Sequence, residues 1–216
     1  MIVDERIVSY MNSLEKANTE VLSDIEREAH RDGVPIIRKE MESFLRVLLS
    51  IKRPMKILEL GTAIGYSAIL MSECIDQEAK IVTIENYDKR IPIARENIIK
   101  AGKSEMIELL EGDALEIMPS LTENQFDFVF MDAAKAQYIH FLPEVLRLMK
   151  KGAVLVTDNV LQEGDLIESK YVVRRRDRTI HKRMREYLEV VKNHPALETS
   201  IVPIGDGITM SVKKSE

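Results

Sequence analysis

The feature that most limits the fold of this chain is a series of short apolar runs, after Pro54, that alternate with stretches of helical periodicity. The apolar runs are Lys56–Leu60, Lys80–Ile84, Met106–Leu110, Phe126–Met131 and Ala153–Thr157. The helical stretches between them are Tyr66–Cys74, Lys89–Ala101, Ala114–Met118 and Ala136–Met149. Apolar runs without polar alternation indicate strands that are buried on both faces. The alternation predicts a doubly wound α/β fold with a mostly parallel sheet.

The two ends of the chain depart from this pattern. Apolar residues in the first 53 positions recur at helical spacing, with an interruption at 32–35 where the sequence reads Asp-Gly-Val-Pro. Near the other end, Thr199–Ile204 and Ile208–Val212 flank Gly-Asp-Gly, a pattern typical of an antiparallel hairpin. We therefore predict a single domain, with a helical N-terminal cap segment over 1–53 and an α/β core over 54–216 that the hairpin closes.

Composition excludes several classes of protein. The net charge of −5 is not that of a polycation, and one cysteine cannot form an internal disulfide or a Cys-rich zinc site. The longest charge-free stretch, Leu60–Ser72, is shorter than the roughly 20 apolar residues that a membrane-spanning helix needs. The N-terminus lacks the basic-then-apolar pattern of a signal peptide. We therefore expect a soluble, cytoplasmic protein without a membrane partner.

A glycine loop follows the first predicted strand and opens a helix, where open α/β sheets bind ligands. It reads Glu59-Leu-Gly61-Thr-Ala-Ile-Gly65-Tyr-Ser67. The Gly-x-x-x-Gly spacing lacks the tight cradle that a pyrophosphate needs, which disfavours NAD. Glu59 also disfavours NAD, because a carboxylate there would repel a diphosphate and attract a cation. Gly61 and Gly65 would let a ligand approach the backbone closely.

Two further acids follow the next strands. Glu85 ends the second strand, where an acid accepts hydrogen bonds from a ribose diol, and Asp113 follows the third strand, where it could meet an adenine edge. A nucleoside with a positively charged tail satisfies all three acids, and S-adenosylmethionine is such a ligand. The alternative is that the glycines serve only a tight turn and that Glu85 lies on the surface.

Oxygen-bearing side chains follow the fourth and fifth strands. Asp132 ends one of them, and Asp158 and Asn159 end the other. Because these strand ends should be neighbours, we expect two carboxylates and one amide oxygen to meet. All-oxygen ligation favours Mg²⁺, or a similar hard ion such as Mn²⁺, over zinc. The alternative is that Asp158 and Asn159 cap a helix.

Lys135 follows Asp132 by three residues, and Tyr138 follows by three more. A helix beginning near Ala133 would place all three on one face. A metal ion and a cationic cofactor nearby would favour the neutral amine, which suits a general base acting on a hydroxyl. The alternative is a lysine that only balances the charge of Asp132.

Three motifs together resemble the catechol and caffeoyl-CoA type of class I, Mg²⁺-dependent O-methyltransferases. They are Glu59-Leu-Gly-Thr-x-x-Gly-Tyr-Ser67, Asp132-Ala-Ala-Lys-x-x-Tyr138 and Asp158-Asn-Val160. The resemblance covers nearly the whole chain and implies a Rossmann-like class I methyltransferase fold and a homodimer. The residues that it implies for contact with S-adenosylmethionine are Ile37, Glu59, Gly61, Ser67, Glu85, Asp113, Ala114 and Asp132.

The same resemblance implies that Asp132, Asp158 and Asn159 hold the metal, and that Lys135, beside Asp132, is the catalytic base. The sequence departs from the catechol enzymes at one informative place. Those enzymes carry His-Trp after the metal-binding aspartate, whereas this chain has Ala133-Ala134 and no tryptophan. The aromatic wall for a catechol ring is therefore missing from that position.

A basic segment runs from Lys170 to Arg185 in an otherwise acidic chain, with Asp177 as its single acid. Its cations are Lys170, Arg174, Arg175, Arg176, Arg178, Lys182, Arg183 and Arg185. Clustered arginines are typical of nucleic-acid binding, and Arg174, Arg175, Arg176 and Arg178 are the predicted RNA contacts. The alternatives are a solvated helix, a dimer contact paired with acids, or a site for a phosphorylated CoA ester.

The overall sequence is similar to bacterial tRNA 5-hydroxyuridine methyltransferases within this family. That similarity implies methylation of the 5-hydroxyl of a wobble uridine in the tRNA anticodon loop, giving 5-methoxyuridine. The adjacent 5-hydroxyl and 4-carbonyl resemble the two oxygens of a catechol, and an unpaired base can enter a pocket. The alternatives are methylation of a small catechol or an acyl-CoA phenol, a nicotinamide-dependent oxidoreductase, and a non-catalytic nucleoside-binding or RNA-binding module.

Overall fold

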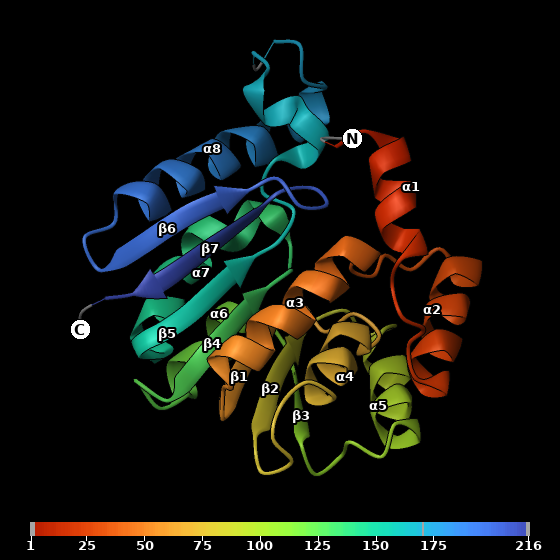
Figure 1. The fold of residues 1–216 in the computed structure, drawn as a ribbon. Coiled ribbons are helices and arrows are strands. Elements are labelled where there is room, and N and C mark those ends of the chain that lie inside the picture. Colours follow the sequence, from red (N-terminus) through yellow and green to blue (C-terminus); the bar gives the residue numbers. More distant parts are fainter. Residues whose placement is uncertain (1–2, 170, 215–216) are drawn as a thin grey trace.

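The computed structural model describes residues 3–169 and 171–214. Its centre is a seven-stranded sheet in the order β3-β2-β1-β4-β5-β7-β6 (Figure 1). Neighbouring strands from β1 to β5 pair in parallel, whereas β7 pairs antiparallel with both β5 and β6. The strands are β1 (Lys56–Leu60), β2 (Lys80–Glu85), β3 (Ile107–Glu111), β4 (Phe126–Met131), β5 (Met149–Thr157), β6 (Leu197–Val202) and β7 (Ile208–Lys213). The predicted fold class is confirmed.

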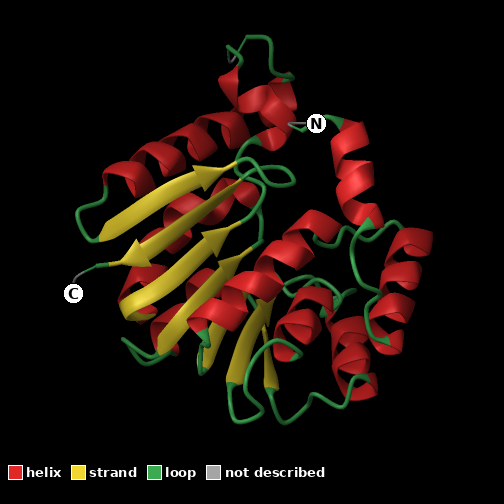
Figure 2. Ribbon diagram, in the orientation of Figure 1, coloured by secondary structure: helices red, strands yellow, loops and turns green. Residues whose placement is uncertain are grey.

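Helices cover both faces of this sheet (Figure 2). α3, α4 and α5 lie over one face, with α2 outside them, and α6, α7 and α8 lie over the other (Figure 1). The helices are α1 (Glu5–Ser13), α2 (Glu20–Asp32), α3 (Lys39–Lys52), α4 (Tyr66–Ser72), α5 (Ile91–Lys100), α6 (Ala114–Ile117), α7 (Tyr138–Leu148) and α8 (Arg178–Asn193). No helix within the described ranges has the length and apolar content needed to cross a membrane.

The core is divided by the sheet, as strands buried on both faces require. In β1, Leu58 packs into the cluster that contains Phe141 of α7, while its neighbour Ile57 packs into the cluster that contains Leu45 of α3. Each of these strand residues is fully buried. Burying a large aliphatic side chain contributes about 1.5–3 kcal/mol, so successive residues of one strand fix helices on opposite faces.

Several boundaries differ from the predicted ones by one or two residues, as in β6, for which the sequence predicts Thr199–Ile204 and which spans Leu197–Val202, and two differences are larger. β5 begins at Met149 rather than Ala153, because the lysines at 150 and 151 interrupt the apolar pattern without interrupting the strand, whose pairing shifts register beside Phe126. The expectation of a helix beginning near Ala133 is wrong. Ala134 is extended, Lys135–Gln137 form a 3₁₀ turn, and α7 begins only at Tyr138.

The N-terminal helices are fastened to the core by a polar cluster. The hydroxyl of Tyr66, at the start of α4, donates to the buried Glu42 carboxylate of α3 over 2.8 Å. Asn18 donates to the same carboxylate over 3.0 Å. The predicted boundary between residues 53 and 54 falls between α3 and β1. This cluster places the segment before α3 beside the loop after β1.

Backbone hydrogen bonds join the chain segments that follow the central strands. Gly61 N–H donates to the Ile84 carbonyl over 3.0 Å, Asp132 N–H to Leu60 over 2.9 Å, and Asp158 N–H to Met131 over 3.0 Å. The segments after β1, β4 and β5 therefore lie next to one another at the carboxyl edge of the sheet. The strand order reverses between β1 and β4, which is where doubly wound sheets bind ligands.

Candidate active site

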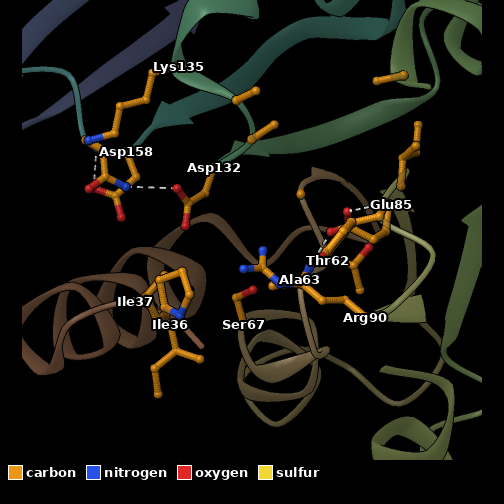
Figure 3. Close-up of a pocket in the computed structure, with 18 of the residues that line it drawn as sticks. Ile36, Ile37, Thr62, Ala63, Ser67, Glu85, Arg90, Asp132, Lys135 and Asp158 are labelled. Carbon is orange, nitrogen blue, oxygen red and sulfur yellow. Dashed lines mark hydrogen bonds between the residues drawn. The ribbon is translucent and has the colours of Figure 1, made fainter. Parts of the chain in front are cut away.

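A cavity of about 750 Å³ opens at this edge of the sheet (Figure 3). Its walls come from the strand ends, the segment before α3, and the turn between β6 and β7. It gathers most of the predicted site residues, namely Ile37, Gly61, Ser67, Glu85, Asp113, Ala114, Asp132, Lys135, Asp158 and Asn159. Glu59 and the arginines of the basic segment lie elsewhere, as described below.

Gly61 is required by the packing of β1 against the segment after β4. Its φ is +99°, and a side chain there would overlap the backbone carbonyl of Asp132. Gly65, with φ of +85°, begins α4 in the left-handed conformation. The first glycine therefore serves contact between two strand ends in addition to the predicted close approach of a ligand.

Glu59 lies behind the cavity wall rather than in it. Its fully buried carboxylate accepts hydrogen bonds from Ser67 Oγ over 2.6 Å and from Thr83 Oγ1 over 2.5 Å. Burial raises the pKa of Glu59 to about 7. Glu59 is not among the residues that line the cavity, and Ser67, which binds it, lies between its carboxylate and the cavity; the direct contact of Glu59 with the ligand stays a prediction.

Glu85 lines the cavity but is tightly held by backbone groups. One carboxylate oxygen accepts from Ala63 N–H over 2.7 Å, and the other accepts from Asn86 N–H over 3.0 Å and Tyr87 N–H over 2.9 Å. The side chain is buried, so the alternative of a surface glutamate is wrong. A carboxylate has about four lone-pair positions, so about one remains for a ligand hydroxyl.

The residues around Glu85 complete this end of the cavity. Asp113 caps α6 by accepting a hydrogen bond from Leu115 N–H over 2.8 Å, and Ala114 beside it is buried. Ile37 approaches from the segment before α3 (Figure 3). Arg90, which the sequence reasoning missed, also lines the cavity, and its guanidinium lies 5.4 Å from the centre of the Tyr87 ring.

The structure brings the three predicted metal ligands together at the other end. Asn159 Nδ2 donates to Asp132 Oδ1 over 2.9 Å, and Asn159 N–H donates to Asp158 Oδ1 over 2.6 Å (Figure 3). The helix-cap alternative is wrong, because Asn159 has φ of +61° and is followed by a 3₁₀ segment only at Gln162. Burial raises the pKa of both Asp132 and Asp158, and the charge of Asp132 raises that of Asp158 further.

These residues fit a hard divalent cation. Two carboxylates that disfavour each other's charge gain from a positive ion between them, and carboxylate and amide oxygens are the donors that such ions prefer. Across 3–169 and 171–214, no three or more His, Cys, Asp and Glu side chains group to hold a metal. The site therefore depends on Asn159, whose amide must turn to present its oxygen in place of the nitrogen that faces Asp132.

Lys135 is paired with an acid that the sequence reasoning missed. Its Nζ lies 3.1 Å from Oδ2 of Asp206, in the turn between β6 and β7, so Asp206 rather than Asp132 is its salt-bridge partner. Tyr138 does not share a face with Lys135. It is fully buried, and its hydroxyl donates to the Asp158 carbonyl over 3.2 Å. Asp206 could be found only from the strand order, which places its turn at the ligand edge.

The basic segment lies outside the cavity, and one of its arginines contacts the turn that bears Lys135. Arg174, Arg175 and Arg176 are exposed, and Arg178 donates to the Val173 carbonyl over 3.3 Å. Arg183 of α8 donates to the carbonyl of Ala136, next to Lys135, over 3.1 Å.

Among the described residues of the segment, the ion pair is between Arg176 and its neighbour Asp177. Lys170 falls outside the described residues.

Comparison with known proteins gives one consistent result. The sequence profile of the O-methyltransferase family matches residues 12–214. A catechol O-methyltransferase of Niastella koreensis is 30% identical, over 76% of this chain and 70% of its own length. Caffeoyl-CoA O-methyltransferase 5 of Nicotiana tabacum is 32% identical, over 77% of this chain and 72% of its own length. The crystal structure of an O-methyltransferase from Bacillus cereus in complex with SAH is similar with a TM-score of 0.85 and 26% identity, covering 97% of both chains.

Proposed function

The chain belongs to the O-methyltransferase family, and from this premise we propose that it transfers the methyl group of S-adenosylmethionine to a hydroxyl oxygen. Membership of this family sets aside the nicotinamide oxidoreductase and the non-catalytic binding module. The complex of the Bacillus cereus neighbour with SAH supports the choice of methyl donor. The arrangement of acids along the cavity agrees with a ligand that has a nucleoside at one end and a cation at the other.

The proposed cofactor contacts follow from this arrangement. Glu85 takes a ribose hydroxyl with its remaining lone pair, and Asp113 and Ala114 lie beside the adenine. Gly61 and Ser67 border the methionine portion, and Ile37 closes over the ligand from the segment before α3. Glu59 acts through Ser67, whose hydroxyl it holds.

At the acceptor end, Asp132, Asp158 and Asn159 would hold a divalent cation, Mg²⁺ or Mn²⁺. That ion, when bound, lowers the pKa of an acceptor hydroxyl and orients it. Lys135 receives the hydroxyl proton when its amine is neutral, or orients the hydroxyl when it is the ammonium that pairs with Asp206, while the oxygen–methyl bond forms and the sulfur–methyl bond breaks. Fixed positions of these groups supply most of the rate gain.

For the acceptor, we propose the 5-hydroxyl of 5-hydroxyuridine at the wobble position of tRNA. The observation that carries this proposal is the exposed row Arg174–Arg176, which continues into α8 and so reaches, through Arg183, the turn that bears Lys135. Exposed arginines near a catalytic cavity suit the phosphates of an anticodon loop. The small Ala133 and Ala134 leave room for a base instead of building an aromatic wall. A tRNA acceptor also agrees with the cytoplasmic location expected from the sequence.

A small catechol or an acyl-CoA phenol is the second candidate, because the curated relatives bear those names. The two candidates differ in their need for the arginines. A catechol needs none of them, whereas a CoA ester needs a few phosphate contacts and an RNA needs many.

Mass spectrometry of tRNA nucleosides tests the proposal. Purified protein, S-adenosylmethionine and Mg²⁺ are incubated with tRNA from cells that lack the protein, and in parallel with catechol and caffeoyl-CoA. Conversion of 5-hydroxyuridine to 5-methoxyuridine is the expected result. Methylation of catechol or caffeoyl-CoA with unchanged tRNA would replace the proposed acceptor by the second candidate.

A further inference from the structure

The turn between β6 and β7 contributes a buried acid to the acceptor end of the cavity. Asp206 is 5% exposed and lines the cavity. Its two carboxylate oxygens have different partners: Oδ2 accepts from Lys135 Nζ over 3.1 Å, and Oδ1 accepts from the backbone N–H of Glu163. One side chain thus contacts both the lysine after β4 and the segment after β5.

Backbone contacts dock the same turn independently of that carboxylate. Leu161 N–H donates to the Asp206 carbonyl over 2.9 Å, and Val160 N–H donates to the Gly207 carbonyl over 2.8 Å. Gly207 has φ of +79°, and a side chain there would overlap Leu161. The turn is therefore packed directly against the residues that follow Asn159.

The segment that this turn holds has an unfavourable backbone. Asn159, Gln162 and Glu163 have φ of +61°, +51° and +55°, values that cost residues other than glycine about 1–3 kcal/mol each. Such conformations persist only where surrounding contacts fix them. Asp206 binds Glu163 N–H and Gly207 packs against Leu161, whereas Asn159 is held by its hydrogen bonds with Asp132 and Asp158. The turn therefore holds the segment that follows the proposed metal-binding set, as well as Lys135.

We propose that Asp206 is a positioning residue that acts on methyl transfer through Lys135, an inference that rests on the proposed function. A buried carboxylate strongly favours retaining its cationic partner, because an unpaired buried charge is costly. Asp206 therefore fixes the Lys135 side chain at the acceptor end, while the backbone contacts of the turn hold the segment after β5. The sequence alone does not connect these two residues, which lie on separate strand ends.

The variant Asp206→Asn separates the two contacts. Its amide oxygen can still accept from Glu163 N–H, whereas its NH₂ group cannot accept from Lys135. We expect kcat on tRNA carrying 5-hydroxyuridine to fall about 10- to 100-fold, the usual cost of a small displacement of a reacting group. The affinity for S-adenosylhomocysteine, measured by calorimetry, should stay unchanged. Asp206→Glu, which keeps a carboxylate, should recover part of the loss.

A double-mutant cycle with Lys135→Met distinguishes positioning from general damage. If Asp206 acts through Lys135, Asp206→Asn lowers kcat in the wild type but has little further effect in the Lys135→Met background. Equal losses in both backgrounds would overturn the proposal. Glu198→Gln, which removes an exposed ion pair with Lys214 between the same two strands, is the matched control and should retain wild-type kcat.

Thermal unfolding of the four proteins of the cycle provides a measurement that needs no substrate. They are the wild type, Asp206→Asn, Lys135→Met and the double mutant. If the two residues are coupled, the Tm shifts of the two single mutants will not add up to the Tm shift of the double mutant. If they do add up to it, the pairing of Lys135 with Asp206 is contradicted. If the wild type methylates none of tRNA, catechol and caffeoyl-CoA, the proposed function fails. The unfolding cycle still decides whether Asp206 holds Lys135, so the two failures are distinguishable.

Discussion

The two ends of the cavity satisfy their acids in different ways. At the cofactor end, neutral donors surround Glu85 and Glu59: backbone N–H groups bind the first, and the hydroxyls of Ser67 and Thr83 bind the second. At the acceptor end, Asp132 and Asp158 face each other, and the salt bridge of Lys135 goes to Asp206. At the cofactor end, donors from the protein already bind the carboxylates. The acceptor end has more acidic than basic side chains, and a bound cation would compensate this negative charge.

The two ends also take their residues from different parts of the chain. The cofactor end is lined by residues from 37, 61–67, 85–90 and 113–114, and the acceptor end by residues from 132–135, 158–159 and 205–206. Binding of the methyl donor and catalysis should therefore respond to different substitutions.

Removing a carboxylate from the acceptor end should have the largest effect. Asp158→Ala should lower turnover by a factor of about 1,000, because the proposed divalent cation, which would stabilise the reacting oxygen, would lose a ligand. The affinity for S-adenosylhomocysteine, measured by calorimetry, should be retained. Asp165→Ala, in the exposed part of the following segment, is the control and should keep turnover. For the same reason EDTA should abolish turnover and Mg²⁺ should restore it, and full activity in EDTA would contradict this contrast between the two ends.

A glycine-to-alanine substitution at the cofactor end should lower the stability of the fold rather than turnover. Gly61→Ala should lower the free energy of unfolding by about 3 kcal/mol, because it combines a positive φ with overlap on the Asp132 carbonyl. Gly33→Ala also places a side chain at a positive φ, of +65°, but that side chain meets open space and should cost only about 1 kcal/mol. Urea unfolding of both variants measures the difference, and equal costs would show that the contact between β1 and the segment after β4 is not tight.

The raised pKa of Glu59 predicts a pH-dependent stability at the cofactor end. The folded protein holds this proton up to about pH 7, whereas the unfolded chain releases it near 4.5, so the free energy of unfolding falls as pH rises between these values. Between pH 5 and pH 8 the wild type should lose about 2–3 kcal/mol more than Glu59→Gln. Urea unfolding of both proteins at the two pH values measures this difference. If the free energy of unfolding changes equally with pH in the two proteins, the Glu59 pKa lies near its ordinary value.

Substitution of the arginines should give the smallest change and should leave the cofactor end untouched. Changing Arg174, Arg175 and Arg176 to Ala should weaken tRNA binding about 10-fold at low salt and reduce the salt slope by about three. Fluorescence anisotropy with labelled tRNA measures both quantities.

The control for this prediction removes the same charge elsewhere. Changing Arg27, Arg31 and Lys100, which are exposed on α2 and α5, to Ala should leave tRNA binding nearly unchanged. If both triple variants lose the same tRNA affinity, the basic segment affects binding only through the net charge of the protein.

Much of this architecture could be predicted from sequence because it depends on local patterns. The buried strands at Lys56–Leu60 and Phe126–Met131 have the predicted bounds, since both are apolar runs between turn residues. Polar residues at strand ends could likewise be assigned to the ligand edge. The homodimer and the single-domain organisation stay predictions.

What the sequence could not supply is contact between distant segments. Lys135 is an example: the alanines before it favour a helix, but Asp132 is bound to the end of β1 and Ala134 stays extended. Asp206 is another, because its role depends on β7 pairing with β5. The burial of Glu59 behind Ser67 depends on α4 packing over β1. In each case tertiary contacts override what a local pattern indicates.

We propose that the acceptor end of the cavity holds one divalent cation. Crystals of the protein grown with S-adenosylhomocysteine and Mn²⁺ and measured for anomalous scattering would locate this ion. We expect a single peak bound by one oxygen each from Asp132, Asp158 and Asn159. Density for S-adenosylhomocysteine without a peak among these three side chains would contradict it.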